Sequence, residues 1–293
     1  MIVGGGFKSK VLPFPFSSPS WSSDGNRVAF TGIELVGKNA VFNVYDAAAG
    51  GTEITKLPGT TGGLSAVLSP DGRTLAFARK REREARRPHR GKVTVFRSVS
   101  IWLLSIDSGT VRQLTPWRNG LSAYPSSFSP DGSILAFSRD WQNRPSAVSI
   151  RLDGSEETVL AGSAADPAYS PDGTRLAMTT LGRPRTISRK GESLTFSPTE
   201  LAVAAADGSG LTRLTRTRNL ELTPSWDPSG QRIAYVLFSP VLNDFSALAA
   251  GDSVMEINAD GSCKTKVLSV PKVGFFGPTW QPGPGREAGP ISC

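Results

Sequence analysis

A ten-residue segment recurs along this chain, and its repetition constrains the fold more than any other feature. Residues 226–235 read W-D-P-S-G-Q-R-I-A-Y. Each copy has a large apolar anchor, a turn built from Pro, Asp or Ser and Gly, and an apolar run that ends in Ala and a large residue. A side chain such as Asp can accept hydrogen bonds from the backbone ahead of it and Gly can adopt a positive φ, so each copy predicts a β-hairpin. The anchors are Trp21, Leu68, Phe128, Tyr169 and Trp226, and a shortened copy, W-Q-P-G, begins at Trp280.

The segments between anchors repeat as well. Successive anchors are 41 to 60 residues apart, which leaves room for four short strands in each interval. A third strand and an Asp-Gly or Gly-Gly turn are predicted after each hairpin, at 41–46, 101–107, 148–153, 201–207 and 254–260. A closing strand follows at 54–57, 111–114, 158–160, 211–214 and 265–268. No long segment has helical periodicity, so the sequence predicts an all-β fold.

These residues resemble the WD-like repeats of the TolB-type six-bladed β-propellers, whose signature is S-P-D-G followed by an Ile/Leu-Ala-Phe strand. The resemblance extends over about residues 7–282. It implies a six-bladed β-propeller of four-stranded antiparallel blades, with five complete blades and a partial blade closed by both termini. It also implies one domain, residues 1–282, with a flexible C-terminal tail at 283–293. TolB proteins carry an additional N-terminal α/β domain that has no counterpart in this sequence, so only the propeller half of the resemblance applies.

The two ends of the chain are expected to share a blade. Residues 4–12 are similar to 261–268, which predicts that the chain begins with an outermost strand and ends with an innermost strand at Trp280. The two middle strands of that blade are missing. One hypothesis is that an upstream segment supplies them together with a secretion signal. The alternatives are a thin sixth blade, or a five-bladed ring with overlapping ends.

Composition limits the remaining classes. The chain has 293 residues, and no run of 18 apolar residues or signal-peptide pattern is visible in it. Its two cysteines, Cys263 and Cys293, provide no disulfide framework and no four-ligand zinc site. They are either free thiols or one bridge. The resemblance implies a periplasmic or extracellular location, whereas a true start at Met1 would imply the cytoplasm.

The basic charge is concentrated in two segments. Residues 79–92 have a net charge of +6 and residues 183–190 a net charge of +4, in a chain whose total is +8. Both segments are expected to be loops between the second and third strands of blades 2 and 4, on the face around the mouth of the central channel. This face would attract anionic partners. The candidate contacts to phosphate or carboxylate groups are Arg81, Arg83, Arg86, Arg87, Arg183, Arg185 and Arg189. The alternative is a solvated insertion, and the single nearby aromatic residue, Phe96, does not favour base-specific nucleic-acid binding.

Sequence motifs for catalysis are weak. There is no G-x-S-x-G motif, and the only histidine, His89, lies among cations; neither a metal nor a cofactor is expected. The aspartates Asp24, Asp71, Asp131 and Asp172 are interpreted as turn residues and the aromatic anchors as core. The sequence therefore favours a non-catalytic, TolB-like scaffold that binds a protein partner or an anionic polymer and is associated with the cell envelope. Two alternatives remain. One is an accessory propeller of a prolyl-oligopeptidase-type hydrolase. The other is a propeller enzyme, either lactonase-like or a glycosidase or lyase that uses carboxylates near the channel mouth, for which the candidates are Asp140, Asp166, Glu221 and Asp244.

Overall fold

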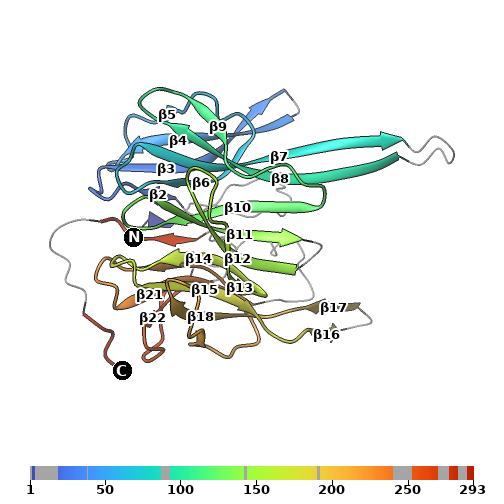
Figure 1. Ribbon diagram of the computed structural model, residues 1–293. Coiled ribbons are helices and arrows are strands. Elements are labelled where there is room, and N and C mark those ends of the chain that lie inside the picture. The colour runs from blue at the N-terminus through green and yellow to red at the C-terminus, as the bar shows by residue number, and fades with distance from the viewer. Residues whose placement is uncertain are drawn as a thin grey trace.

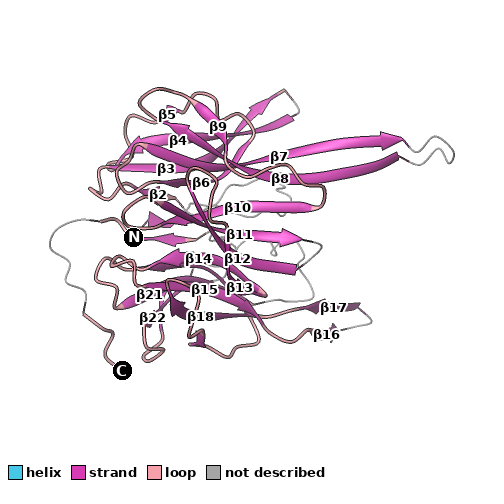
Figure 2. Ribbon diagram, in the orientation of Figure 1, coloured by secondary structure: helices cyan, strands magenta, loops and turns pink. Residues whose placement is uncertain are grey.

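The computed structural model describes residues 2–3, 19–37, 39–86, 93–141, 144–189, 192–239, 253–269, 277–282 and 289–293. Every regular element assigned within these ranges is a β-strand (Figure 2). The predicted all-β class is therefore confirmed.

Twenty of the strands form five four-stranded units, each following one of the predicted repeats. Unit 1 contains β2 (Ser20–Trp21), β3 (Arg27–Val36), β4 (Asn39–Ala48) and β5 (Thr55–Lys56). Unit 2 contains β6 (Gly63–Leu68), β7 (Thr74–Arg86), β8 (Val93–Ser105) and β9 (Val111–Gln113). Unit 3 contains β10 (Leu121–Phe128), β11 (Ile134–Trp141), β12 (Arg144–Arg151) and β13 (Thr158–Gly162). Unit 4 contains β14 (Ala164–Tyr169), β15 (Arg175–Leu181), β18 (Thr199–Ala205) and β19 (Thr212–Arg213), and unit 5 contains β20 (Leu220–Trp226), β21 (Arg232–Phe238), β22 (Ser253–Asn258) and β23 (Thr265–Ser269).

Neighbouring strands within a unit are antiparallel, as the repeat predicts. Units 2 and 3 are joined into one eight-stranded sheet by a single parallel pair between Ser122 of β10 and Val99 of β8. Two further two-stranded sheets complete the fold. One pairs β16 (Arg185–Arg189) with β17 (Glu192–Phe196), and the other pairs β1 (Ile2–Val3) with β24 (Pro278–Thr279).

The S-P-D-G turns are held by the same hydrogen bonds in units 1 to 4. In unit 4 the Ser170 hydroxyl donates to Asp172 Oδ1 at 2.6 Å, and the Thr174 amide donates to the same oxygen at 3.1 Å. The Arg175 amide then donates to Ser170 Oγ at 3.0 Å, and Gly173 takes a φ of 71°. The interpretation of the four aspartates as turn residues is confirmed, since Asp24, Asp71 and Asp131 make the equivalent contacts.

Unit 5 exchanges the two side chains of this turn. Asp227 stands where the other units have Ser, and Ser229 stands where they have Asp. The Ser229 hydroxyl donates to Asp227 Oδ2 at 2.6 Å, and the Arg232 amide donates to Asp227 Oδ1 at 2.9 Å. The hydrogen-bond pattern is retained, but the carboxylate is now the buried member of the pair.

Adjacent units are bonded through their inner strands, at or just before the anchor residue. Where the next anchor is Leu or Tyr, its backbone amide donates to a serine hydroxyl of the preceding unit. Where the next anchor is Trp, its indole N–H donates to a backbone carbonyl of the preceding unit. The pairs are Leu68 N to Ser20 Oγ (2.9 Å), Tyr169 N to Ser127 Oγ (3.2 Å), Trp226 Nε1 to Ala168 O (3.0 Å) and Trp280 Nε1 to Ser225 O (3.3 Å).

Arginine side chains reinforce the last two of these junctions. The guanidinium of Arg175 in unit 4 lies 4.6 Å from the ring centroid of Trp226 in unit 5. Arg232 of unit 5 lies 5.0 Å from the ring of Trp280 in the same way. Trp226 is 6% exposed, which agrees with its predicted role in the core between sheets. Each tryptophan thus contributes apolar area and a cation–π contact to the junction.

The two ends of the chain meet at β1 and β24, where Ile2 pairs with Thr279 (Figure 1). The Gln281 side chain donates to the carbonyl of Gly25 in unit 1 at 3.1 Å, so the segment after β24 also reaches the first unit. A sheet shared by both termini was predicted. The outermost strand predicted at residues 4–12 lies outside the described residues.

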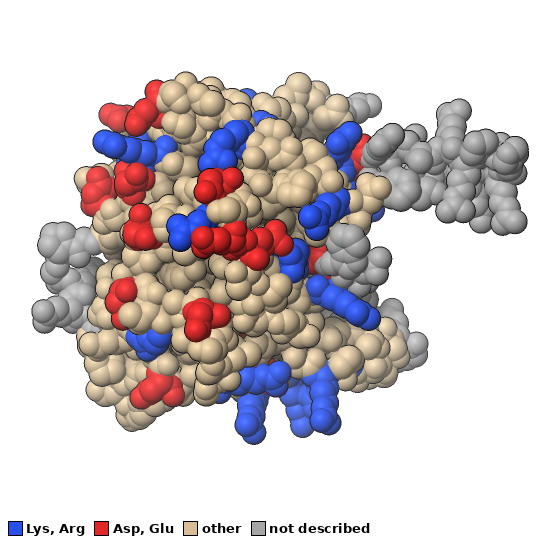
Figure 3. Space-filling view, in the orientation of Figure 1, with Lys and Arg blue, Asp and Glu red and all other residues tan. Residues whose placement is uncertain are grey.

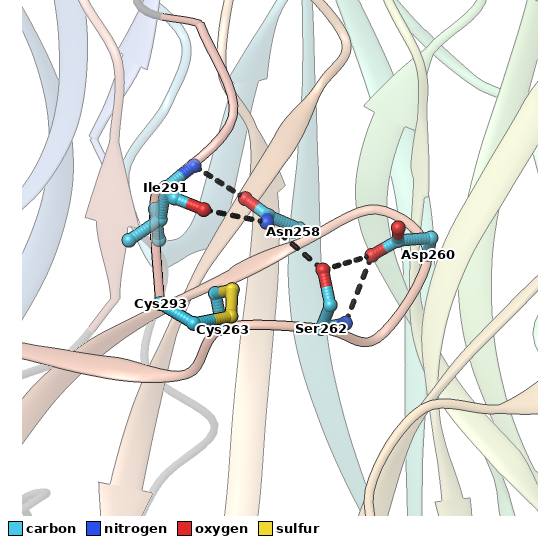
Figure 4. The surroundings of a disulfide bond; sticks show 6 residues. All are labelled: Asn258, Asp260, Ser262, Cys263, Ile291 and Cys293. Carbon is cyan, nitrogen blue, oxygen red and sulfur yellow. Dashed lines mark hydrogen bonds between the residues drawn. A yellow bond between two sulfur atoms is a disulfide. The ribbon is translucent and has the colours of Figure 1, made fainter.

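The last residues of the chain are attached to unit 5. Cys263 and Cys293 form a disulfide with a Cα–Cα distance of 5.0 Å, which resolves the open choice between thiols and a bridge (Figure 4). The Asn258 amide donates to Ile291 O at 3.0 Å and accepts from Ile291 N at 2.7 Å. The end of the segment predicted as a flexible tail is therefore held against the β22–β23 turn.

The repeated turns should make stability depend on pH. Hydrogen bonds from Ser170 and the Thr174 amide lower the pKa of Asp172 to about 2, from an ordinary value of 3.8. A lowered pKa stabilises the folded state above the ordinary value, and this stabilisation is lost as pH falls toward about 2. We expect Asp172→Asn and Ser170→Ala to lower the free energy of unfolding by about 1 kcal/mol at pH 7.

Denaturant unfolding between pH 2 and pH 7 measures this effect. The difference between wild type and Asp172→Asn should shrink toward pH 2. Asp107→Asn is the control, because the Asp107 side chain is 75% exposed and makes only a 3.9 Å ion-pair contact. A Ser170→Ala protein as stable as wild type at pH 7 would contradict the prediction.

Candidate functional site

The described parts of the two basic segments contribute strands to β-hairpins instead of forming the loops that the sequence predicts. Strand β7 continues through the first segment as far as Arg86, which pairs with Val93 of β8. The second segment begins the β16–β17 hairpin, in which Arg185 pairs with Phe196. Both hairpins project from the same side of the molecule, on the right in Figure 1, and we call this side the arm-bearing face.

Aromatic side chains support the base of the β7–β8 hairpin. The Arg79 guanidinium lies 4.7 Å from the Trp102 ring and donates to the carbonyl of Gly59, in the loop before β6. The Arg81 guanidinium lies 5.8 Å from the Trp117 ring, in the loop before β10. The hairpin and the loops between successive units therefore emerge on one face, as predicted. Cation–π contacts orient these two arginines and leave Arg81 exposed.

The predicted contact residues divide between the two hairpins. Arg81, Arg183 and Arg185 are exposed, and Lys and Arg side chains lie along this right-hand edge in Figure 3. Arg81 lies on the β7–β8 hairpin, whereas Arg185 lies on the separate β16–β17 hairpin. Arg83 and Arg86 lie in β7 and Arg189 lies in β16, while Arg87 and His89 lie outside the described residues.

A central cavity of about 810 Å³ runs between the inner strands. All six inner strands, β2, β6, β10, β14, β20 and β24, contribute to its wall. The prolines of the turns line one end: Pro70, Pro130, Pro171, Pro228 and Pro282. Polar residues occur at the other end, which is the side of the hairpins: Ser65, Tyr124, Ser126, Ser138, Asp140, Asp166 and Thr223. Prolines of the turns therefore line one end of the cavity, and the carboxylates Asp140 and Asp166 lie toward the arm-bearing face.

Backbone strain is concentrated at this polar end. Ser65, Asp166 and Thr223 occupy the same position in three inner strands and have left-handed φ values of 51°, 53° and 51°. A β-bulge interrupts the strand pairing at each of them. A left-handed φ is uncommon for residues other than glycine, and it is least favourable for a β-branched residue such as threonine. Such strain persists only where the surrounding structure enforces it, and it is common at binding sites.

Asp166 connects three units at the polar end. Its backbone amide donates to Ser138 Oγ of unit 3 at 2.8 Å, and its Oδ2 accepts from the Thr223 amide of unit 5 at 3.3 Å. Burial raises the pKa of the Asp166 carboxyl despite these hydrogen bonds. Asp140 Oδ1 and Thr223 Oγ1 are buried and have no hydrogen-bond partner among the described residues.

The four carboxylates predicted near the channel mouth do not all lie at the cavity. Asp140 and Asp166 both line the cavity. Glu221 is fully buried away from it, accepting from the Leu201 amide at 3.0 Å and lying 3.5 Å from Lys264 Nζ. Asp244 lies outside the described residues. Within the described ranges, no three Asp, Glu, His or Cys side chains are grouped closely enough to bind a metal ion.

Residues Ser138 and Thr223 were not identified from the sequence. Neither belongs to a motif, and Asp166 and Thr223 are 57 positions apart in the chain. Only the arrangement of inner strands around the cavity brings them together.

No helix among the described residues is long and apolar enough to cross a membrane.

Comparison with known proteins supports the resemblance in the repeats. No family model matches the chain. A TolB homologue of Chlorobium chlorochromatii is 29% identical over 47% of this chain, and the match spans 28% of that protein. An uncharacterised protein of Agrobacterium fabrum is 24% identical over 77% of the chain and 67% of its own length. The chain thus spans less than a third of the TolB homologue that it matches.

Solved structures show the same fold. A TolB-type protein from Agrobacterium tumefaciens superposes with a TM-score of 0.63 at 23% identity, over 91% of this chain and 86% of that one. TolB from Acinetobacter baumannii superposes with a TM-score of 0.59 at 17% identity, over 89% of this chain and 57% of that one. The chain is a TolB-like β-propeller. This TolB-like propeller also superposes on an oligogalacturonate lyase in complex with manganese, with a TM-score of 0.52 at 13% identity over 88% of this chain and 66% of the lyase.

Proposed function

We propose that this TolB-like propeller is a non-catalytic scaffold that binds a protein partner on the arm-bearing face. The observation that carries the proposal is the pair of hairpins that extend beyond units 2 and 4 on one side and carry exposed arginines. Strands that extend beyond their sheet enlarge the surface that a partner can contact. Arginine supplies planar, charged donors for carboxylate groups. An acidic partner surface would therefore complement this face.

The proposal includes a six-bladed ring, in which units 1 to 5 are five blades and β1 and β24 begin the sixth. Three contacts support it. Ile2 pairs with Thr279, Trp280 donates to Ser225 of unit 5, and Gln281 donates to Gly25 of unit 1. The β1–β24 sheet is thereby connected to both the last and the first unit.

We also propose an extracytoplasmic location, periplasmic or extracellular, with association with the cell envelope. The disulfide between the only two cysteines of the chain supports it, because such bridges persist in oxidising compartments. Thiol titration of protein purified without reductant tests this part of the proposal. We expect neither cysteine to react under denaturing conditions, and two reactive thiols in protein from the native host would contradict it.

A second candidate function is a sugar-active propeller enzyme. The observation that favours it is that Asp140 and Asp166 both line the central cavity. A carboxylate pair can act as general acid and base on a glycosidic bond. Turnover of a polysaccharide by wild type, abolished in an Asp166→Asn protein, would favour this candidate over the scaffold.

Charge reversal on the hairpins tests the scaffold proposal. Arg81 and Arg185 are exposed, one on each hairpin, and Arg81→Glu with Arg185→Glu changes the net charge by the same amount as a control pair. The control is Arg73→Glu with Lys266→Glu, two exposed residues placed on a turn and on an outer strand. We expect the hairpin pair to weaken binding by about tenfold or more, because opposed charges across an interface become like charges.

The measurement is affinity for a partner identified from envelope fractions, determined by biolayer interferometry at several salt concentrations. Wild-type affinity should fall steeply toward about 0.5 M salt. Equal losses in the hairpin and control variants would assign the effect to net charge. Unchanged affinity in the hairpin variant would rule out the arm-bearing face as the binding surface.

A further inference from the structure

At the polar end of the central cavity, two oxygen atoms lack hydrogen-bond partners. Asp140 Oδ1 and Thr223 Oγ1 are buried and have no such partner among the described residues, and both residues line the cavity. Ser138, which contacts Asp166 Oδ1 at 3.4 Å, precedes Asp140 by two positions on β11. Residues two apart on a strand face the same side at a spacing of about 7 Å. The Asp140 and Asp166 carboxylates therefore occupy neighbouring positions on one wall.

The negative charge of this wall is not balanced inside the cavity. Arg139 is the one Lys or Arg among the described residues that line it. Its guanidinium is bound to Glu157 at 2.5 Å, on the outer strand side of unit 3. Buried carboxylates are ordinarily paired with a cation or fully hydrogen-bonded. Burial raises the pKa of the Tyr124 phenol, and the nearby Asp140 carboxylate acts in the same direction.

We propose that the polar end of the central cavity binds a primary aliphatic ammonium group through Asp140, Asp166 and Thr223. An ammonium group has three donors and no acceptor, so it complements two carboxylates and the oxygen of the Thr223 hydroxyl. The cavity volume of 810 Å³ lies within the range of roughly 300–1,000 Å³ that is usual for small-molecule sites. The two carboxylates suit a diamine best, with one ammonium group for each.

This site is separate from the hairpin arginines and does not depend on the proposed partner. The amine has two possible sources, a free diamine or the side chain of a lysine presented by another protein. Non-specific attraction is not expected to imitate the site, because the chain has a net charge of +8 and repels cations in general. Saturable binding of a small dication would therefore be specific.

Isothermal titration calorimetry with 1,5-diaminopentane at pH 7 and low salt tests the proposal. We expect one binding site per chain and no binding of 1,5-pentanediol, which has the same length but no charge. Asp166→Asn and Asp140→Asn should each weaken binding by about tenfold or more, since a hydrogen bond between charged groups is lost. Asp107→Asn, the same substitution at an exposed position, should bind as wild type does.

Titration of Nα-acetyl-lysinamide in parallel distinguishes the two sources. Tighter binding of the diamine would indicate a free ligand, and equal or tighter binding of the lysine derivative would indicate a lysine side chain. Failure of both to bind wild type, or equal binding by wild type and both aspartate variants, would overturn the proposal. Equal affinity for 1,5-pentanediol would overturn it as well.

A stability measurement separates a ligand site from a structural role and does not require the ligand. Burial raises the folded-state pKa of Asp166, so its ionisation destabilises the fold as pH rises above the unfolded value. Asp166→Asn should therefore be more stable than wild type at pH 7, and the difference should vanish below about pH 4. The described titratable residues that line the cavity with Asp166 are Tyr124, Arg139, Asp140 and Tyr169, and they are the same in both proteins. A lower melting temperature of Asp166→Asn at pH 7 would show that the carboxyl is structural.

Discussion

The hydrogen bonds between neighbouring inner strands are the interaction on which the rest of this structure depends. A four-stranded unit cannot bury the faces of its own sheet, so a neighbouring unit must cover them. Four anchors, Leu68, Tyr169, Trp226 and Trp280, meet this need twice, because the side chain packs between sheets and an N–H group bonds to the preceding unit. Tryptophan bonds through its indole, as Trp226 does to Ala168, whereas Tyr169 bonds through its backbone to Ser127. The central cavity, the bulges and the direction of the hairpins all follow from this radial arrangement.

Much of the fold could be predicted from the sequence, because its determinants are local. Each S-P-D-G turn is completed within six residues, and even the exchanged turn at Asp227 and Ser229 preserves the hydrogen bonds of the others. The basic hairpins could not be predicted in the same way. The run at residues 79–86, within the basic segment 79–92, was expected to be part of a loop because of its charge. In the structure its residues pair with β8, and Arg79 and Arg81 rest on Trp102 and Trp117, which are distant in sequence.

The candidate site was only partly predictable. Exposed arginines were identified from charge alone, and the structure places Arg81 and Arg185 on separate hairpins of one face. The polar end of the cavity has no local signature, since Ser138, Asp166 and Thr223 come from three units and meet only when the inner strands surround a common space. Nor could spacing decide whether Cys263 and Cys293 pair, because the turn that holds Cys263 and the segment that holds Cys293 meet through Asn258. The exposed arginines and the carboxylates of the cavity together give the propeller a basic outer rim and an acidic interior on the same side.

The most direct test of this account is residue-resolved hydrogen exchange at the inner strands. If neighbouring units are joined as described, the amides of Leu68 and Tyr169 should be protected as strongly as those in the middle of β11, because each donates to a serine hydroxyl of the preceding unit. Ser127→Ala should then remove the protection of Tyr169 and leave that of Leu68 unchanged. Rapid exchange of both amides in the wild-type protein would contradict the radial arrangement, and with it the central cavity and the shared face on which both proposed sites depend.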